Sequence, residues 1–105
     1  MARYITYKEL TEKLGAFKSV KNAPSRNGEG VAPNQFILTF ENGYVFQSYN
    51  AVCAAKVGGE TYLTRYHDYS NTTSLHVGRW LGRGAKERRE GMVDGDYIVV
   101  KDYER

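Results

Sequence analysis

The chain has 105 residues, a length that suits one domain with a single modest hydrophobic core. Its formal net charge of +3 is weaker than that of histone-like proteins and opposite to that of proteins that imitate DNA, so neither class is expected. The single cysteine excludes an internal disulfide and a cysteine-based zinc site, and the lack of a signal-peptide pattern or of ~20 consecutive apolar residues predicts a soluble cytoplasmic protein.

The first predicted element is a short amphipathic helix in the segment ITYKELTEKLG, Ile5 to Gly15. Thr6 and Glu9 have the spacing of a capping box, and Gly15 is a typical stop. The segment Lys21 to Gln35 follows, with both prolines, two glycines and no hydrophobic period. It predicts a long loop, and loops of this length are commonly functional or mobile.

The segment from Gln35 to Tyr66 predicts an antiparallel meander of three strands. Asn42-Gly43 is a hairpin signal after QFILTF, and Gly58-Gly59 predicts a second tight turn before ETYLTRY. Between these turns runs the long segment YVFQSYNAVCAAKV, whose polarity changes at Gln47 to Asn50. The pattern leaves open whether these four residues are a bend in the strand or part of a site.

A second helix is predicted to begin among Ser70 to Thr73, all good N-cap residues, and to end near Gly82 or resume through AKERREG. The segment Tyr97 to Val100 predicts a last strand. The predicted fold class is therefore α+β: a single domain over residues 1–105, with an antiparallel meander of three to four strands and two helices in the order α-β-β-β-α-β.

Several side chains invite a chemical interpretation, but none forms a complete catalytic or metal-binding set. His67, Asp68 and His76 are too few for a metal site, and Cys53 lies in an apolar run typical of a core strand. We expect Asp68, with Ser70 and Thr72, to order the turn and the start of the second helix. His67, Tyr69 and His76 are then partner contacts at most. No catalytic residue, metal or cofactor is predicted, and the protein is expected not to be an enzyme.

A basic cluster follows in GRWLGRGAKERRE. Arg79, Arg83 and Lys86 recur at i, i+4 and i+7, which would form one stripe if the helix were continuous. The alternatives are a solvated helix face and a surface that contacts phosphates or an acidic partner. Nine tyrosines favour a binding surface, because tyrosine is enriched at interfaces and on base-stacking surfaces. The predicted partner-binding residues are Arg79, Arg83, Lys86, Arg88, Arg89, Tyr66 and Tyr69.

Residues 36–81 carry a resemblance to a family. FILTFENGYVFQSYNAVCA and YLTRYHDYSNTTSLHVGRWL resemble a small, uncharacterised family of bacteriophage and mobile-element proteins with F-x-N-G, Q-S-Y-N and D-Y-S-x-T-T-x-x-H motifs. In size and setting the chain also resembles type II-A anti-CRISPR proteins. The resemblance implies a stoichiometric inhibitor in the bacterial host cell that binds a host protein or ribonucleoprotein such as Cas9 with its guide RNA, with no membrane or small-molecule substrate. The alternative is a nucleic-acid-binding accessory protein that uses the cluster from Arg79 to Arg89.

Overall fold

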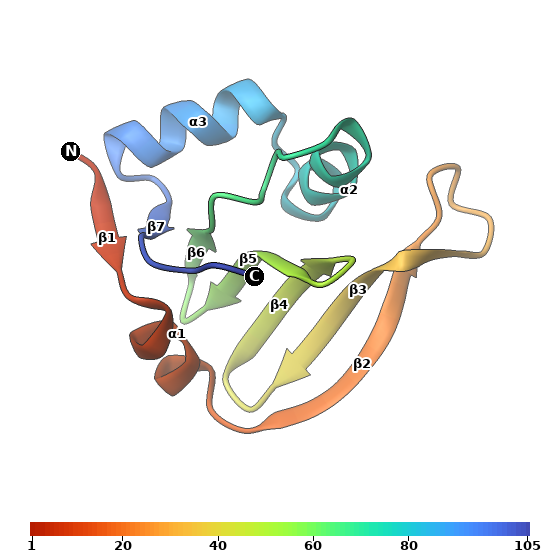
Figure 1. Cartoon of the computed structure of the whole chain (residues 1–105), viewed down its shortest axis with the longest axis horizontal. Coiled ribbons are helices and arrows are strands. Elements are labelled where there is room, and N and C mark those ends of the chain that lie inside the picture. Colours follow the sequence, from red (N-terminus) through yellow and green to blue (C-terminus); the bar gives the residue numbers. More distant parts are fainter.

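A seven-stranded mixed sheet with helices packed against it organises the chain, and the computed structural model describes all 105 residues (Figure 1). The elements in chain order are β1 (Arg3–Ile5), α1 (Tyr7–Leu14), β2 (Phe17–Pro24), β3 (Val31–Phe40), β4 (Gly43–Ser48), β5 (Ala51–Val57), β6 (Glu60–Leu63), α2 (Asn71–Leu81), α3 (Ala85–Asp94) and β7 (Ile98–Val100). The strand order across the sheet is β1-β7-β6-β5-β4-β3-β2. Strand β7 runs parallel to both of its neighbours, and all other adjacent pairs are antiparallel.

The predicted meander of three to four strands with two helices is wrong. Five consecutive strands, β2 to β6, form the antiparallel part, and β1 and β7 add a parallel edge. There are three helices because the chain breaks between α2 and α3. The three-residue β1 gives too short a pattern to be read locally, since its pairing with β7 joins residues more than ninety positions apart, as in Arg3 with Ile98.

The predicted loop from Lys21 to Gln35 is also wrong, because most of it belongs to the β2–β3 hairpin. Its two prolines are tolerated for positional reasons. Pro24 is the last residue of β2, which is an edge strand. Pro33 lies in a part of β3 that extends past β4, since the β3–β4 pairing begins only at Gln35. Neither proline therefore removes a hydrogen bond from the centre of the sheet.

The segment Gln47 to Asn50 is a turn, and it divides the predicted long second strand into β4 and β5. Tyr49 has a φ of 55°, the left-handed region that side chains other than glycine rarely adopt. Its amide donates to the Asn34 carbonyl at 2.7 Å, and the Gln47 side chain donates to the Tyr49 carbonyl at 2.9 Å. These bonds hold the turn. The turns predicted at Asn42-Gly43 and Gly58-Gly59 are confirmed.

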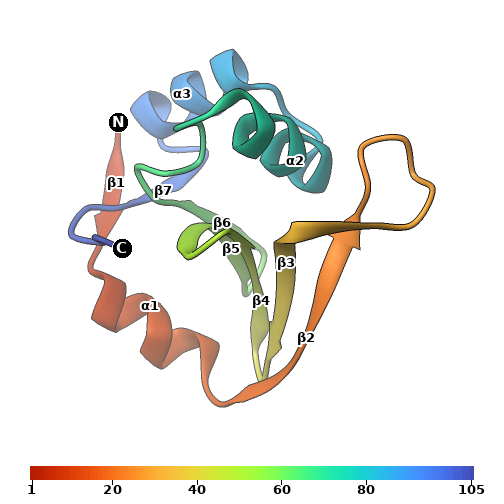
Figure 2. The same ribbon diagram turned by 45° about the vertical axis from the view of Figure 1, so that its right-hand side comes forward.

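The sheet has a buried layer on each face. On one face α1 packs through Leu10 and Leu14 onto Val45, whereas on the other face α2 and α3 cover a second cluster that includes Val77 and Phe46 (Figure 2). The run AVCAA in β5 is apolar at every position because it is buried on both faces, as expected for a central strand. None of the three helices has the length and apolar character needed to cross a membrane.

The predicted starts of the first two helices are confirmed, with one correction. Thr6 and Glu9 form the complete capping box of α1. Ser70 is the N-cap of α2, and its hydroxyl accepts a hydrogen bond from the Thr73 amide at 3.1 Å. Thr72 is exposed on the first turn and makes no capping bond, so its predicted role is wrong. Thr73 instead joins α2 to the sheet through a 2.8 Å bond to Ser48.

Candidate functional site: a cationic groove

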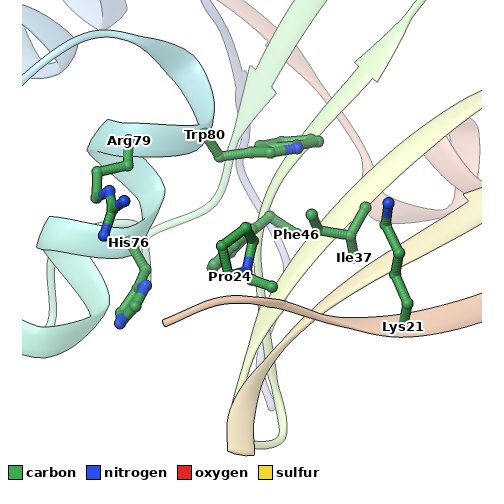
Figure 3. Close-up of a pocket in the computed structure, with 8 residues that line it drawn as sticks. Lys21, Pro24, Ile37, Phe46, His76, Arg79 and Trp80 are labelled. Carbon is green, nitrogen blue, oxygen red and sulfur yellow. The ribbon is translucent and has the colours of Figure 1, made fainter. Parts of the chain in front are cut away.

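A groove of about 320 Å³ lies between α2 and the strands β2, β3 and β4 (Figure 3). We call it the cationic groove, and it is lined by Lys21, Ala23, Pro24, Ile37, Phe46, His76, Arg79 and Trp80. Its floor is apolar, with Phe46 and Ala23 fully buried. Its polar groups are basic, because lysine, histidine and arginine are present and no acidic side chain lines it.

One face of α2 supplies two of the three basic side chains that line the groove. His76, Arg79 and Trp80 are spaced i, i+3 and i+4, so they lie on the same side of the helix and face the hairpin. Arg79 also fixes the hairpin loop, since its Nη1 donates to the Ser25 carbonyl at 3.0 Å and to the Arg26 carbonyl. These contacts hold the hairpin loop against α2 beside the groove.

Trp80 is the large aromatic of the groove, and its indole is held in place by neighbours. The Phe46 ring lies 5.6 Å from it, centroid to centroid, at an interplanar angle of 39°. The Lys56 ammonium sits 4.3 Å from the ring centroid and donates to the Trp80 carbonyl at 3.1 Å. Lys56 does not line the groove. The indole is partly exposed there, beside Pro24 and Ile37 (Figure 3). A fixed, partly exposed aromatic ring is suited to stacking with a flat ligand.

The groove carries positive charge that no carboxylate compensates. Lys21 and Arg79 are exposed and take part in none of the ion pairs of the protein. The pKa of His76 is lowered by burial and by the positive charges of Arg79 and Arg26. Burial disfavours a charge of either sign, but the positive charges of Arg79 and Arg26 favour an anion, so this part of the electrostatics suits a negatively charged ligand.

His76 is the most unusual member of the groove. The residue is only 7 % exposed, and neither ring nitrogen hydrogen-bonds to another protein group. The ring nitrogens are not among the buried atoms that lack a partner, so they face the solvent of the groove. The imidazole lines the groove (Figure 3), where a ligand oxygen would replace this water.

The structure divides the predicted basic stripe. Arg83 lies in the connection between α2 and α3 and, with Arg79, lines a shallower depression formed around Gly78, Gly82 and Gly84. Lys86 is exposed on the first turn of α3. Arg89 points elsewhere and pairs with Asp68 at 3.0 Å. The basic side chains do not form one stripe, because α2 ends at Leu81 and α3 begins three residues after Gly82, which is the break that the sequence indicated.

Arg88 is the clearest correction among the predicted partner-binding residues, because its side chain is 0 % exposed. Its Nε donates to His67 Nδ1 at 3.0 Å, and its Nη2 donates to Ser74 Oγ at 2.7 Å and to the His67 carbonyl at 3.3 Å. Its Nη1 donates to the Arg83 carbonyl at 2.7 Å. Gly78 leaves room for this guanidinium, since a Cβ there would lie 3.0 Å from Nη1. Arg88 thus joins α3 to α2 and to the preceding turn.

His67 belongs to the same buried network, so it is not free for the partner contact that the sequence left open. It is 3 % exposed, and burial lowers its pKa to about 4. The neutral ring accepts the hydrogen bond from Arg88. Cys53 is confirmed as a core residue: it is fully buried beside Phe46 and Leu63, and burial raises the pKa of its thiol to about 12.

Tyr66 and Tyr69 lie on a separate surface, which we call the tyrosine surface and which also includes Tyr49 and Arg105. The Tyr66 and Tyr69 rings meet edge to face at 6.0 Å, and the Arg105 guanidinium lies 5.6 Å and 5.1 Å from their centroids. Tyr49, Tyr69 and Arg105 line a second, broader depression together with Phe36. The turn at Gln47 to Asn50 is thus a bend that also presents a tyrosine to this surface.

Of the predicted partner-binding residues, only Arg79 lies in the cationic groove, together with His76, which the sequence left open as a partner contact. The other residues that form the groove were missed for different reasons. The spacing of His76, Arg79 and Trp80 on one helix face was visible in the sequence and signals a shared surface. No sequence pattern indicated that Lys21 faces α2, because the segment that contains it was predicted to be a loop.

Together these features define a small α+β protein with a mixed sheet and a positively charged surface groove. The chain belongs to DUF8033, a family of unknown function whose model matches residues 18–96. That range includes every residue of the cationic groove but excludes β1, α1 and β7. Comparisons with curated proteins and with solved structures gave no match.

Proposed function

We propose that the protein binds nucleic acid through the cationic groove and acts as an accessory protein of a phage or mobile element in the host cell. The observation that carries the proposal is the uncompensated positive charge of the groove next to an apolar, aromatic floor. Phosphates account for most of the affinity of proteins for nucleic acids, whereas aromatic side chains contact bases.

The surroundings of the groove extend this charge. Arg26 lies close enough to lower the pKa of His76, and Arg83 shares the neighbouring depression with Arg79. A strand that enters the groove would therefore meet further cations on leaving it. Arg88 and Arg89 take no part in the proposal, because one is buried and the other pairs with Asp68.

The test is the salt dependence of binding for the double variant Lys21→Gln and Arg79→Gln. Glutamine at 79 retains a donor for the loop carbonyls that Arg79 holds, so the fold should persist. If both side chains contact phosphates, the affinity for a labelled single strand falls at least about tenfold, and the slope of log K against log salt decreases by about 1.4. Fluorescence anisotropy over a series of salt concentrations measures both.

The matched control is Lys13→Gln with Arg65→Gln, which removes the same two charges outside the groove, from α1 and from an exposed ion pair with Glu104. It should bind like the unmodified protein. An equal loss of affinity in both double variants would mean that only the net charge of the protein determines binding. The proposal for the groove would then be wrong.

A second candidate function, inhibition of a host ribonucleoprotein such as Cas9, is supported by the tyrosine surface. Tyr49 and Tyr69 are exposed by 47 % and 39 %, next to an arginine that stacks on Tyr69. Tyrosine and arginine are the residue types enriched among interface hot spots. The surface shares no lining residue with the cationic groove, so the two functions can be tested separately.

For this candidate, purified protein is added to guide-loaded type II-A Cas9, and target binding and cleavage are measured separately. Inhibition should fall at least about tenfold in Tyr49→Ala with Tyr69→Ala, which is typical of losing hot-spot contacts. Tyr44→Ala is the control, since this tyrosine is equally exposed on β4 but lies outside the surface. Unchanged binding and cleavage at a large excess of protein would exclude this function.

A further inference from the structure

We infer that the cationic groove is a pocket for one unstacked base and its phosphate, so that the protein binds single-stranded nucleic acid in preference to duplex. This inference rests on the proposed function and specifies its substrate class. It follows from the juxtaposition of a held indole, an apolar floor and three basic side chains in a space of about 320 Å³.

The apolar part of the groove selects for an exposed base. Trp80 and Pro24 flank the opening, and Ile37 and Phe46 lie beneath it (Figure 3). A base inside a duplex is stacked on both faces and cannot enter a recess between a helix and a strand. A base in a single strand can enter edge first and stack against the exposed part of the indole, as in other proteins that bind single strands.

The polar part of the groove suits the phosphate. Lys21 extends from β2, and Arg79 and His76 extend from α2, so cations stand on both walls (Figure 3). Arg79 uses only Nη1 for the loop carbonyls, which leaves its other guanidinium nitrogens without a protein partner. The His76 ring has no hydrogen-bond partner within the protein, and its nitrogens are open to the groove, so a phosphate oxygen would replace water there.

The path beyond the groove argues for a strand over a free mononucleotide. Arg79 lines both the cationic groove and the depression that contains Arg83, so the two recesses adjoin along α2. A mononucleotide would fill only the first recess. A strand would place its next phosphates near Arg83, whose charge is not paired.

Intrinsic fluorescence gives a direct test, because Trp80 is the only tryptophan of the chain. An oligothymidylate of about twelve nucleotides, a length that matches common single-strand sites, is titrated into the protein. We expect saturable quenching of Trp80, with at least about tenfold weaker binding of a duplex of the same length and of thymidine monophosphate. The same titrations followed by anisotropy of labelled probes show binding that does not reach Trp80.

His76→Leu is the informative variant. Leucine fills the buried space, and no protein hydrogen bond is lost, so the fold should be unchanged by circular dichroism. Its affinity for the oligothymidylate should fall about tenfold, as expected for one hydrogen bond to a charged group. Thr72→Val, exposed on the same helix and outside the groove, is the control and should bind normally.

The outcomes separate this inference from the proposed function. Equal binding of duplex and single strand without quenching would overturn the base pocket and leave nucleic-acid binding intact. If thymidine monophosphate bound as tightly as the oligonucleotide, the inference that the groove binds a strand would be wrong, and the groove would be a mononucleotide site. No binding of any probe by either method would overturn the proposed function and, with it, the inference.

Discussion

Replacing Arg88 by alanine will lower the free energy of unfolding by at least about 3 kcal/mol, because it creates a cavity and leaves several buried acceptors without a donor. The guanidinium is fully buried, and its four hydrogen bonds reach His67, Ser74 and the Arg83 carbonyl. These contacts connect α3 to α2 and to the turn that precedes it. Small domains have unfolding free energies of roughly 5–15 kcal/mol, so the loss is a large fraction of the total. Urea unfolding followed by circular dichroism measures it.

Two further variants identify the cause of the loss. Arg88→Met fills most of the volume but donates no hydrogen bond, so a loss close to that of alanine would assign the effect to the hydrogen bonds. Arg89→Ala is the control. Arg89 is exposed, and its single ion pair with Asp68 should contribute less than about 1 kcal/mol to stability. If the Arg88→Ala and Arg89→Ala variants had equal free energies of unfolding, the structural role of Arg88 would be contradicted.

The elements that could be predicted from the sequence are those whose signals are local. The capping box is formed by Thr6 and Glu9, three residues apart, and the hairpin turn by the adjacent Asn42 and Gly43. Both occur where predicted. The start of α2 after Ser70 is of the same kind. Such signals need no knowledge of the rest of the chain.

The errors in the fold come from pairings that are distant in sequence. Strand β2 is exposed at almost every position, and as an edge strand it has a neighbour on one side only. Without an alternation of apolar and polar residues, the two prolines and two glycines of the segment Lys21 to Gln35 indicated a loop. Strand β1 is only three residues long and is ordered by β7 at the other end of the chain. No local pattern specifies either strand.

The candidate site was predictable only in part, for a related reason. A basic cluster in the region of Arg79 is visible in the sequence, but AKERREG shows only charged residues, alanine and glycine where a buried face would normally show leucine or isoleucine. The buried residues of α3 are Arg88 and Gly91. Because the acceptors of Arg88 come from other elements, burial of this arginine could not be inferred from its neighbours in sequence.

Acid will destabilise the protein through His67, and the direction follows from its lowered pKa. The pKa falls from an ordinary value of 6.5 to about 4, chiefly because the ring is buried, and the charges of Arg88 and Arg89 lower it further while Asp68 opposes them. Well above pH 6.5 the ring is neutral in both states, and its contribution to stability is fully present. As the pH falls through 6.5, the unfolded chain binds a proton that the folded chain does not, so the free energy of unfolding decreases. Between about pH 7 and pH 4.5 the loss from this residue is about 2 kcal/mol.

The comparison that isolates this effect is with His67→Asn, whose side-chain oxygen can still accept from Arg88 Nε but does not titrate. Urea unfolding of both proteins across this pH range should show a steep decrease for the unmodified chain and a shallow one for the variant. His76, whose pKa is also lowered, is present in both and cancels in the difference. Glu9 and Glu60 have pKa values below their ordinary 4.5, so their contributions are lost only at lower pH. Parallel curves for the two proteins would mean that His67 accepts a proton in the folded state as readily as in the unfolded chain, contrary to its bond with Arg88.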